Sequence, residues 1–146
     1  MTFEIKGGPS LKETKDRLRS FSRSFANKQI TIIRFKPPQK VQNPTELAKY
    51  EAARFSTEHK IKTFVALGCN VKDLYLGFST SKGEFQELLA EANITSVGII
   101  VQNPFPEGFQ EELSAISYEK DIDGLRDNNP IFFPRRFSGK VICYIL

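Results

Sequence analysis

Three short runs of β-branched and other apolar residues, separated by longer stretches, set the hydrophobic pattern of this 146-residue chain. The runs are residues 29–35, 71–76 and 97–101. Such residues favour strands. The last run is apolar at every position except Gly98, as in a strand covered on both faces.

The stretches between the strands carry helix start and stop signals. Asn43 and Pro44 are typical of an N-cap and a first-turn residue, and they predict a long helix to about Leu67, where Gly68 stops it. Ser81 is the expected N-cap of a second helix, whose apolar stripe is Phe85, Leu88, Leu89 and Ala92. The order strand, helix, strand, helix, strand predicts right-handed crossovers. We therefore expect an α/β fold of three layers: a mostly parallel sheet flanked by helices.

The remaining segments give weaker patterns. We expect a short edge strand over residues 3–5, a basic amphipathic helix that begins at Ser10, and a short helix from Phe109 to Ile116. The segment 131–137 gives no clear pattern, and Val141 to Leu146 fits either a strand or the start of another helix. The length suits one domain, and no linker or internal repeat indicates a second.

Composition is that of a soluble globular protein, with 40% hydrophobic and 26% charged residues. No run approaches the roughly twenty apolar residues that span a membrane, and no signal-peptide core follows Met1. Cys69 and Cys143 stand far apart without a neighbouring His cluster, so we expect no metal site and no disulfide framework. A cytoplasmic location is the simplest expectation.

The net charge of +4 is unevenly distributed, since the expected first helix is rich in Lys and Arg and further cations lie near Arg135 and Arg136. A positive field of this kind attracts phosphates, polyglutamate tails or nucleic acid alike. No nucleic-acid module signature is present, so we favour a solvated helix face and expect neither a nucleic-acid nor a membrane partner.

Polar residues follow the third strand at the edge where open α/β sheets bind ligands. Gln102 ends the run, and Pro104 and Pro106 prevent its continuation. Gln102 either belongs to a site or only closes the strand. The segment from Asp121 to Gly124 is an ordinary turn by its chemistry, although its carboxylates could also bind a ligand.

The long helix adds a lysine. Ser56 and Lys60 are four residues apart and share a face of the helix. A helical lysine is usually a surface residue. One that is held near an apolar pocket has a lowered pKa, however, and can exchange a proton near neutral pH.

Two motifs resemble those of one enzyme family. Residues 98–106 resemble the Gly-Ile-Leu-Val-Gln-Leu-Pro-Leu-Pro stretch of the bifunctional methylenetetrahydrofolate dehydrogenase/methenyltetrahydrofolate cyclohydrolases. Residues 115–124 are similar to their Ala-Ile-x-Pro-x-Lys-Asp-Val-Asp-Gly. Lys60-Ile61-Lys62, with Gly68 following, resembles the Lys-x-Lys and glycine of the family's catalytic helix.

The resemblance implies an enzyme of one-carbon metabolism that acts on a folate substrate. It implies that Lys60 moves protons, that Gln102 orients this lysine and that Asp123 holds the pterin ring. Further substrate contacts are expected from Ser56, Val101, Pro104 and Pro106. Attack of water on the methenyl group requires a proton carrier beside the N5–C–N10 bridge, and a lysine is of the right type.

The chain also departs from the family pattern. Ser56 stands where the family has a tyrosine packed over the folate, and Tyr50 with Arg54 offers a rival pair at the same spacing. The rival pair breaks the match to Gly68, so we favour Lys60. The loop from Lys36 to Asn43 is longer than in the family, and Arg135-Arg136-Phe137 replaces an expected Cys-Thr-Pro.

The resemblance also implies a domain organisation. Residues 1–146 correspond to the folate-binding catalytic domain, and the nucleotide-binding domain is absent from this chain. We expect either a fragment of a longer protein or a free-standing folate-site domain, with a homodimer as a possible assembly. NADP or NAD would serve as cofactor only with the missing domain. The alternative is a non-catalytic folate-binding or interaction module derived from that domain.

Overall fold

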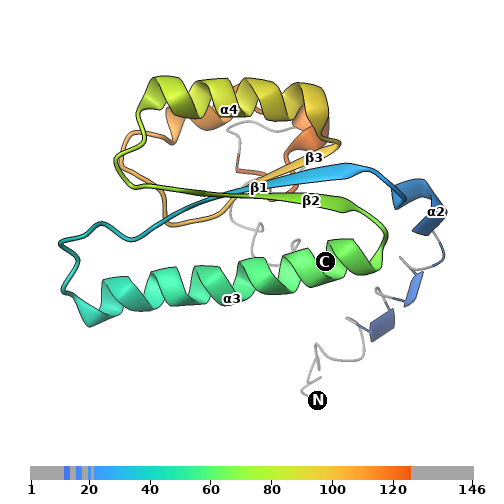
Figure 1. Ribbon diagram of the computed structural model, residues 1–146, viewed down its shortest axis with the longest axis horizontal. Helices are drawn as coiled ribbons and strands as arrows, with labels where there is room; N and C mark the ends of the chain where they lie inside the picture. Colours follow the sequence, from blue (N-terminus) through green and yellow to red (C-terminus); the bar gives the residue numbers. More distant parts are fainter. Residues whose placement is uncertain (1–11, 14–15, 18–19, 21, 126–146) are drawn as a thin grey trace, which may run out of the picture.

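A parallel three-stranded sheet forms the centre of the molecule (Figure 1). The computed structural model describes residues 12–13, 16–17, 20 and 22–125. The strands are β1 (Gln29–Phe35), β2 (Asn70–Leu76) and β3 (Gly98–Val101), in the order β2-β1-β3. All three predicted strands are confirmed, as is their parallel arrangement.

Helices cover both faces of the sheet. Figure 1 shows α3 (Pro44–Ala66) along one face and α4 (Lys82–Thr95) along the other. The predicted caps are confirmed: the Asn43 side chain accepts a hydrogen bond from the backbone N–H of Thr45, and Ser81 forms a capping box with Glu84. The three-layer α/β architecture expected from the sequence is therefore correct.

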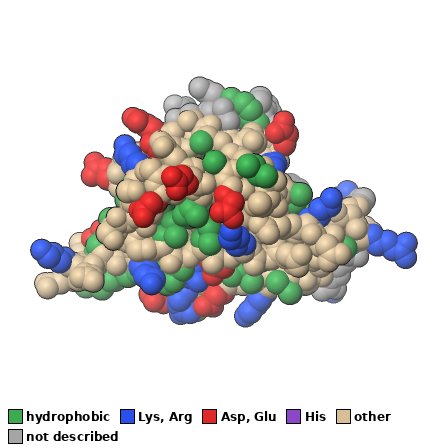
Figure 2. All heavy atoms as spheres, turned by 45° about the horizontal axis from the view of Figure 1, so that its top comes forward, with side chains coloured by type: hydrophobic (Ala, Val, Ile, Leu, Met, Phe, Trp, Pro, Cys, Tyr) green, Lys and Arg blue, Asp and Glu red, His purple; other side chains and the backbone are tan. Residues whose placement is uncertain are grey.

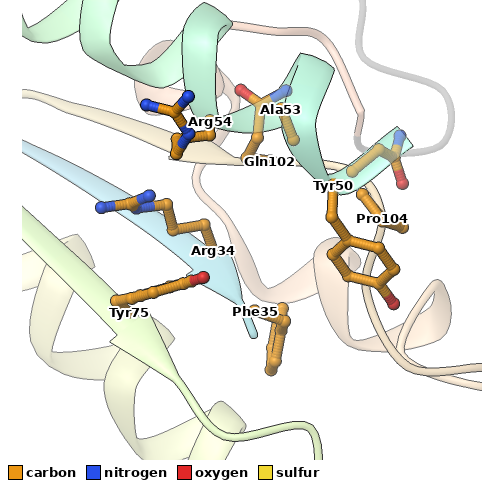
Figure 3. A pocket seen from close by; sticks show the side chains of 9 residues that line it. Arg34, Phe35, Tyr50, Ala53, Arg54, Tyr75, Gln102 and Pro104 are labelled. Atoms are coloured by element: carbon orange, nitrogen blue, oxygen red, sulfur yellow. The ribbon is translucent and has the colours of Figure 1, made fainter. Parts of the chain in front are cut away.

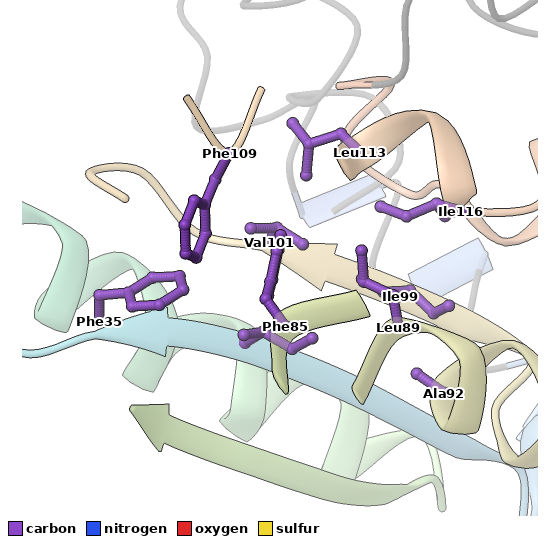
Figure 4. Packing of buried hydrophobic residues seen from close by; sticks show 10 residues of the cluster. Phe35, Phe85, Leu89, Ala92, Ile99, Val101, Phe109, Leu113 and Ile116 are labelled. Atoms are coloured by element: carbon purple, nitrogen blue, oxygen red, sulfur yellow. The ribbon is translucent and has the colours of Figure 1, made fainter. Parts of the chain in front are cut away.

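The strands present alternate residues to two cores, because successive side chains of a strand point to opposite faces. The core beneath α4 contains three aromatic rings, of which Phe85 and Phe109 stack with centroids 4.9 Å apart and Phe35 meets Phe85 edge-on at 5.8 Å (Figure 4). The core beneath α3 is smaller and joins Ile30, Ile32, Phe64, Leu67, Cys69 and Ile100. Cys69 is buried and free.

The short helix predicted from Phe109 to Ile116 is present over only part of that range. Between Phe109 and Ile116 the chain forms a turn and then a short 3₁₀ helix, η1 (Glu111–Ala115), followed by η2 (Tyr118–Lys120). Phe109, Leu113 and Ile116 are buried, so packing against α4 holds the segment without a full α-helix.

Several predictions fall on residues outside the described part of the chain. These are the edge strand 3–5, residues 10–11, 14–15, 18–19 and 21 of the basic first helix, and everything after Leu125. The last residues of the expected first helix are helical and form α2 (Ser22–Phe25). Figure 2 shows acidic side chains over the face of α4, with Lys and Arg projecting mainly at the ends and lower edge of this view. No helix among the described residues could span a membrane.

Candidate functional site

A buried lysine lies at the centre of the candidate site. The Lys60 side chain comes from the inner face of α3 and is only 7% exposed. Its Nζ donates to Oε1 of Gln102 and to Oδ2 of Asp123, both at 3.0 Å. The structure therefore brings together the three side chains that the sequence motifs indicated as catalytic, from three separate segments.

Backbone pairing at the sheet edge fixes the two partners of the lysine. The N–H of Gln102 donates to the carbonyl of Ile33 at 2.8 Å, which carries the β1–β3 pairing one residue past β3. The segment that holds Asp123 runs beside β3, where the Ile122 N–H donates to the Ile99 carbonyl at 3.2 Å. A parallel bridge of Ile99 with Asp121 anchors the same segment.

Gly98 permits this close approach. A Cβ added at this position would lie 2.4 Å from Cδ1 of Ile122, so a side chain here would force the Ile122 side chain, next to Asp123, to shift. Gly124 follows at a φ of +62°, a conformation that glycine adopts without strain. The glycines of both motifs thus help to position the carboxylate.

Three hydrogen-bonding groups at the site have no partner among the described residues. A protonated lysine has three N–H donors, and Gln102 and Asp123 take two of those of Lys60. Oδ1 of Asp123 is buried and has no hydrogen-bond partner among the described residues, and the same holds for Oγ1 of Thr57, one turn earlier on α3. Buried polar atoms normally have partners, so Oδ1 of Asp123 can accept a hydrogen bond from a ligand or from a water.

The predicted substrate-contacting residues do not all lie in one place. Ser56 is half-buried on α3, one turn before Lys60. Pro104 lines a pocket next to Gln102, and the Asn103–Pro104 peptide bond is cis. Pro106 is buried. The Val101 side chain packs into the core beneath α4, so only its backbone could reach a ligand on the α3 side.

The pocket next to Gln102 lies between α3 and the carboxyl ends of the strands (Figure 3). It has an empty volume of about 260 Å³ that is open to solvent. Its lining is formed by Arg34, Phe35, Tyr50, Ala53, Arg54, Tyr75, Gln102, Asn103 and Pro104. The sequence pattern did not predict the contributions of Arg34 and Tyr75. The available signal was a single charged residue, Arg34, in an otherwise uncharged run.

Charge pairs set the electrostatics of this pocket. Nε and Nη2 of Arg34 donate to the two carboxylate oxygens of Asp73 at 2.9 and 2.8 Å. These hydrogen bonds raise the pKa of Arg34 above its usual value. Burial raises the pKa of Tyr50, and Glu46 adds to the effect, so this phenol stays neutral at physiological pH. No cluster of three His, Cys, Asp or Glu suited to a metal occurs within the described residues.

Comparison with known proteins finds relatives whose sequences match only part of this chain. No protein-family model matches the chain. The bifunctional protein FolD of Cenarchaeum symbiosum is 48% identical over 67 residues, which is 43% of this chain and 24% of the relative. FolD of Dechloromonas aromatica is 35% identical over 97 residues, covering 57% of this chain and 34% of the relative. The matches thus span about a third or less of the length of these relatives.

Solved structures give the same relationship at the level of fold. The bifunctional 5,10-methylenetetrahydrofolate dehydrogenase/cyclohydrolase of Thermoplasma acidophilum superposes with a TM-score of 0.68 at 20% identity, covering 86% of this chain and 43% of that one. FolD from Campylobacter jejuni gives a TM-score of 0.67 at 20% identity, covering 85% and 43%. The chain is therefore related, by sequence over part of its length and by fold over most of it, to the N-terminal part of the bifunctional FolD proteins.

Proposed function

We propose that this chain is the folate-binding catalytic domain of a methylenetetrahydrofolate dehydrogenase/methenyltetrahydrofolate cyclohydrolase. The observation that carries the proposal is the buried Lys60, held between Gln102 and Asp123. The sequence relatives are bifunctional FolD proteins, and a solved FolD structure of the same fold is named a methylenetetrahydrofolate dehydrogenase/cyclohydrolase, which supports the same conclusion.

A structural role alone explains the buried pair poorly. Removing two charges from water costs several kcal/mol per ion, and the attraction between the ions often fails to offset that cost. A hydrophobic pair of similar volume would commonly give equal or greater stability. Among the described residues, the lysine has one donor without a partner and the neighbouring carboxylate has one oxygen without a partner, which supports a ligand that uses both groups.

The proposed reaction at this chain's own residues is proton transfer during hydrolysis of the methenyl group. Water adds to the carbon of the N5–C–N10 bridge and loses a proton. N5 gains a proton as its bond to that carbon breaks, and the second proton of the added water is released to solvent as the N10-formyl carbonyl forms. Lys60 carries the proton between these sites. Gln102 orients the amine without adding a charge, and the free Oδ1 of Asp123 accepts from the N–H edge of the pterin.

Dehydrogenation additionally requires a nicotinamide nucleotide. The sequence contains no glycine-rich phosphate-binding motif, so we assign none of its residues to that group. One solved relative, FolD of Trypanosoma brucei, is complexed with NADP. We propose that NADP, or NAD, would be bound by a separate nucleotide-binding domain, that the protein acts in the cytoplasm, and that it can form a homodimer.

The test follows the absorbance of methenyltetrahydrofolate with wild type and Lys60→Met. Loss of a general acid–base group should lower the rate about 100-fold or more. Lys62→Met is the matched control, because Lys62 is an exposed lysine of the same helix. Equal rates for wild type and Lys60→Met would contradict the catalytic proposal.

The second candidate is a folate-binding or interaction module without catalysis. Ser56 favours it, because the stacking tyrosine of the family is missing. This candidate predicts that the full chain binds tetrahydrofolate but leaves the hydrolysis rate at the uncatalysed background. Under it, Lys60→Met would change the binding affinity alone.

A further inference from the structure

One buried polar group at the site takes no part in the proposed reaction. The side chain of Thr57 is completely buried, and its Oγ1 has no hydrogen-bond partner among the described residues. Two other positions at the site lack such a partner, the third N–H of Lys60 and Oδ1 of Asp123. The proposed function uses those two for the reacting centre and the pterin. The Thr57 hydroxyl is the one of the three that has no role.

A threonine hydroxyl in a helix usually finds a partner in the helix itself. It commonly bonds to the carbonyl three or four residues earlier. Thr63 of α3 does so, because its Oγ1 donates to the His59 carbonyl at 3.0 Å. Thr57 does not make the corresponding bond to Ala53. Burying a hydroxyl without a partner costs free energy, so we expect this atom to meet a partner from outside the described residues.

The position of Thr57 brings this hydroxyl to the amine of Lys60. The two residues are three positions apart, and both are buried where α3 covers the sheet (Figure 1). Helical side chains point back toward the helix N-terminus, so the long side chain of Lys60 extends over the turn that contains Thr57. Its Nζ reaches Gln102, directly after β3. The hydroxyl and the amine therefore border the same region of the site.

The proposed hydrolysis brings a water molecule to this region. A neutral Lys60 keeps two N–H donors for Gln102 and Asp123, so its lone pair can accept the first O–H of the attacking water. The second O–H stays on the oxygen until the N10-formyl carbonyl forms, and in a buried site it requires an acceptor. Oγ1 of Thr57 is a buried acceptor that neither the lysine nor the pterin occupies.

We propose that Thr57 is a further catalytic residue of the hydrolysis, whose hydroxyl holds the attacking water against the amine of Lys60. The water oxygen bonds to the methenyl carbon, and one proton passes to Lys60 and then to N5 as the N5–carbon bond breaks. The other proton stays hydrogen-bonded to Oγ1 of Thr57 until it is released to solvent. Two groups that hold one water orient it for attack. The inference rests on the proposed function and goes beyond the family resemblance, which gives position 57 no role.

The experiment measures the steady-state hydrolysis of methenyltetrahydrofolate by the full chain, together with urea denaturation. Thr57→Val has nearly the same shape and lacks the hydroxyl. It should lower kcat about tenfold, the effect of one lost hydrogen bond. KM should stay within about twofold of wild type, because the hydroxyl contacts the water and not the folate. The urea midpoint should equal or exceed that of wild type, because the variant buries a methyl group instead of an unpartnered hydroxyl.

Matched variants separate the hydroxyl from the shape of the side chain. Thr57→Ser keeps the hydroxyl, and its kcat should stay within about threefold of wild type. Thr63→Val makes the same change on the same helix, at a hydroxyl that has a backbone partner, and should leave kcat unchanged. If Thr57→Val does not fold, Thr57→Ala replaces it, because alanine favours helix and also lacks the hydroxyl.

The outcomes distinguish this inference from the proposed function. Equal kcat for wild type and Thr57→Val, with Lys60→Met inactive, would overturn the role of Thr57 and leave the proposed function intact. A raised KM at unchanged kcat would also overturn it, because the hydroxyl would then bind the folate. So would a lower kcat that comes with a lower urea midpoint and that Thr57→Ser does not restore, since that pattern marks a structural role. Failure of wild type to hydrolyse methenyltetrahydrofolate would overturn the proposed function itself.

Discussion

The two faces of the sheet differ in how they treat buried polar groups. Beneath α4 the core is almost entirely apolar, and the buried polar side chains of Thr31 and Ser96 satisfy each other through a hydrogen bond of 2.7 Å. Beneath α3 the core contains Lys60 and Asp123, and two buried oxygens there have no partner among the described residues. The α4 face is thus an apolar packing layer, whereas the α3 face carries buried polar groups that have no partner among the described residues.

The same strands build both faces, so the difference arises from the helices and from the segment after β3. Ile99 and Val101 point to the α4 face, and Ile100 points to the α3 face. The polar groups enter from α3 and from the turn at Asp123. The apolar layer beneath α4 therefore holds the sheet in place without using the polar groups of the site.

The largest stability effect should come from the α4 face. Phe85 is fully buried and stacks on Phe109, so Phe85→Ala should lower the free energy of unfolding by about 3–5 kcal/mol. Phe55→Ala, at an exposed ring on the other side of the molecule, should change it by less than about 0.5 kcal/mol. Urea denaturation measures both. Similar values for the two variants would contradict the division between a stabilising core and the rest of the molecule.

The next effect concerns the buried ion pair. Asp123→Leu leaves Lys60 buried with Gln102 as its remaining partner among the described residues, and should lower the free energy of unfolding by about 3 kcal/mol. The double variant Lys60→Met/Asp123→Leu removes both charges and should recover most of that loss while abolishing folate binding. The measurement is a double-mutant cycle in urea. A double variant as unstable as Asp123→Leu would show that the pair is retained for stability.

The elements that the sequence predicted correctly depend on local signals. Asn43-Pro44 and Ser81 with Glu84 contain their own capping chemistry, and the strands contain their own β-branched runs. The contact of Lys60 with Gln102 and Asp123 spans 42 and 63 positions, and no local pattern encodes it. The motif resemblance supplied those three residues, because it carried tertiary information that periodicity lacks.

What the sequence did not predict depends on strand register and packing. Arg34 pairs with Tyr75 across β1 and β2, and this register decides that both side chains reach one pocket. The 3₁₀ conformation of Glu111–Ala115 follows from how a short segment packs on α4, which a five-residue pattern cannot specify. Val101 was expected to contact the substrate, but strand alternation turns its side chain to the α4 core.

Capping residues provide a finer comparison of the two faces. Ser81→Ala should lower the free energy of unfolding by about 1 kcal/mol, because α4 is packed on the apolar core and cannot fray without exposing that core. Asn43→Ala should cost less, because the first residues of α3 are exposed and can fray alone. Urea denaturation gives the global values, and hydrogen exchange reports fraying. A larger global loss for Asn43→Ala would contradict this assignment.

The smallest expected effect is the pH dependence of the α4 cap. Hydrogen bonds to the backbone and side chain of Ser81 hold the pKa of Glu84 below its usual 4.5. A carboxylate whose pKa is lowered by folding stabilises the protein above its unfolded pKa, and this contribution is lost as the pH falls through the folded pKa. Glu84→Gln keeps the capping geometry but does not titrate. The difference in Tm between wild type and Glu84→Gln should therefore be small and constant above about pH 5, and should change only as the pH falls below about 4.5. A difference that changed between pH 6 and 8 would assign the effect to another group.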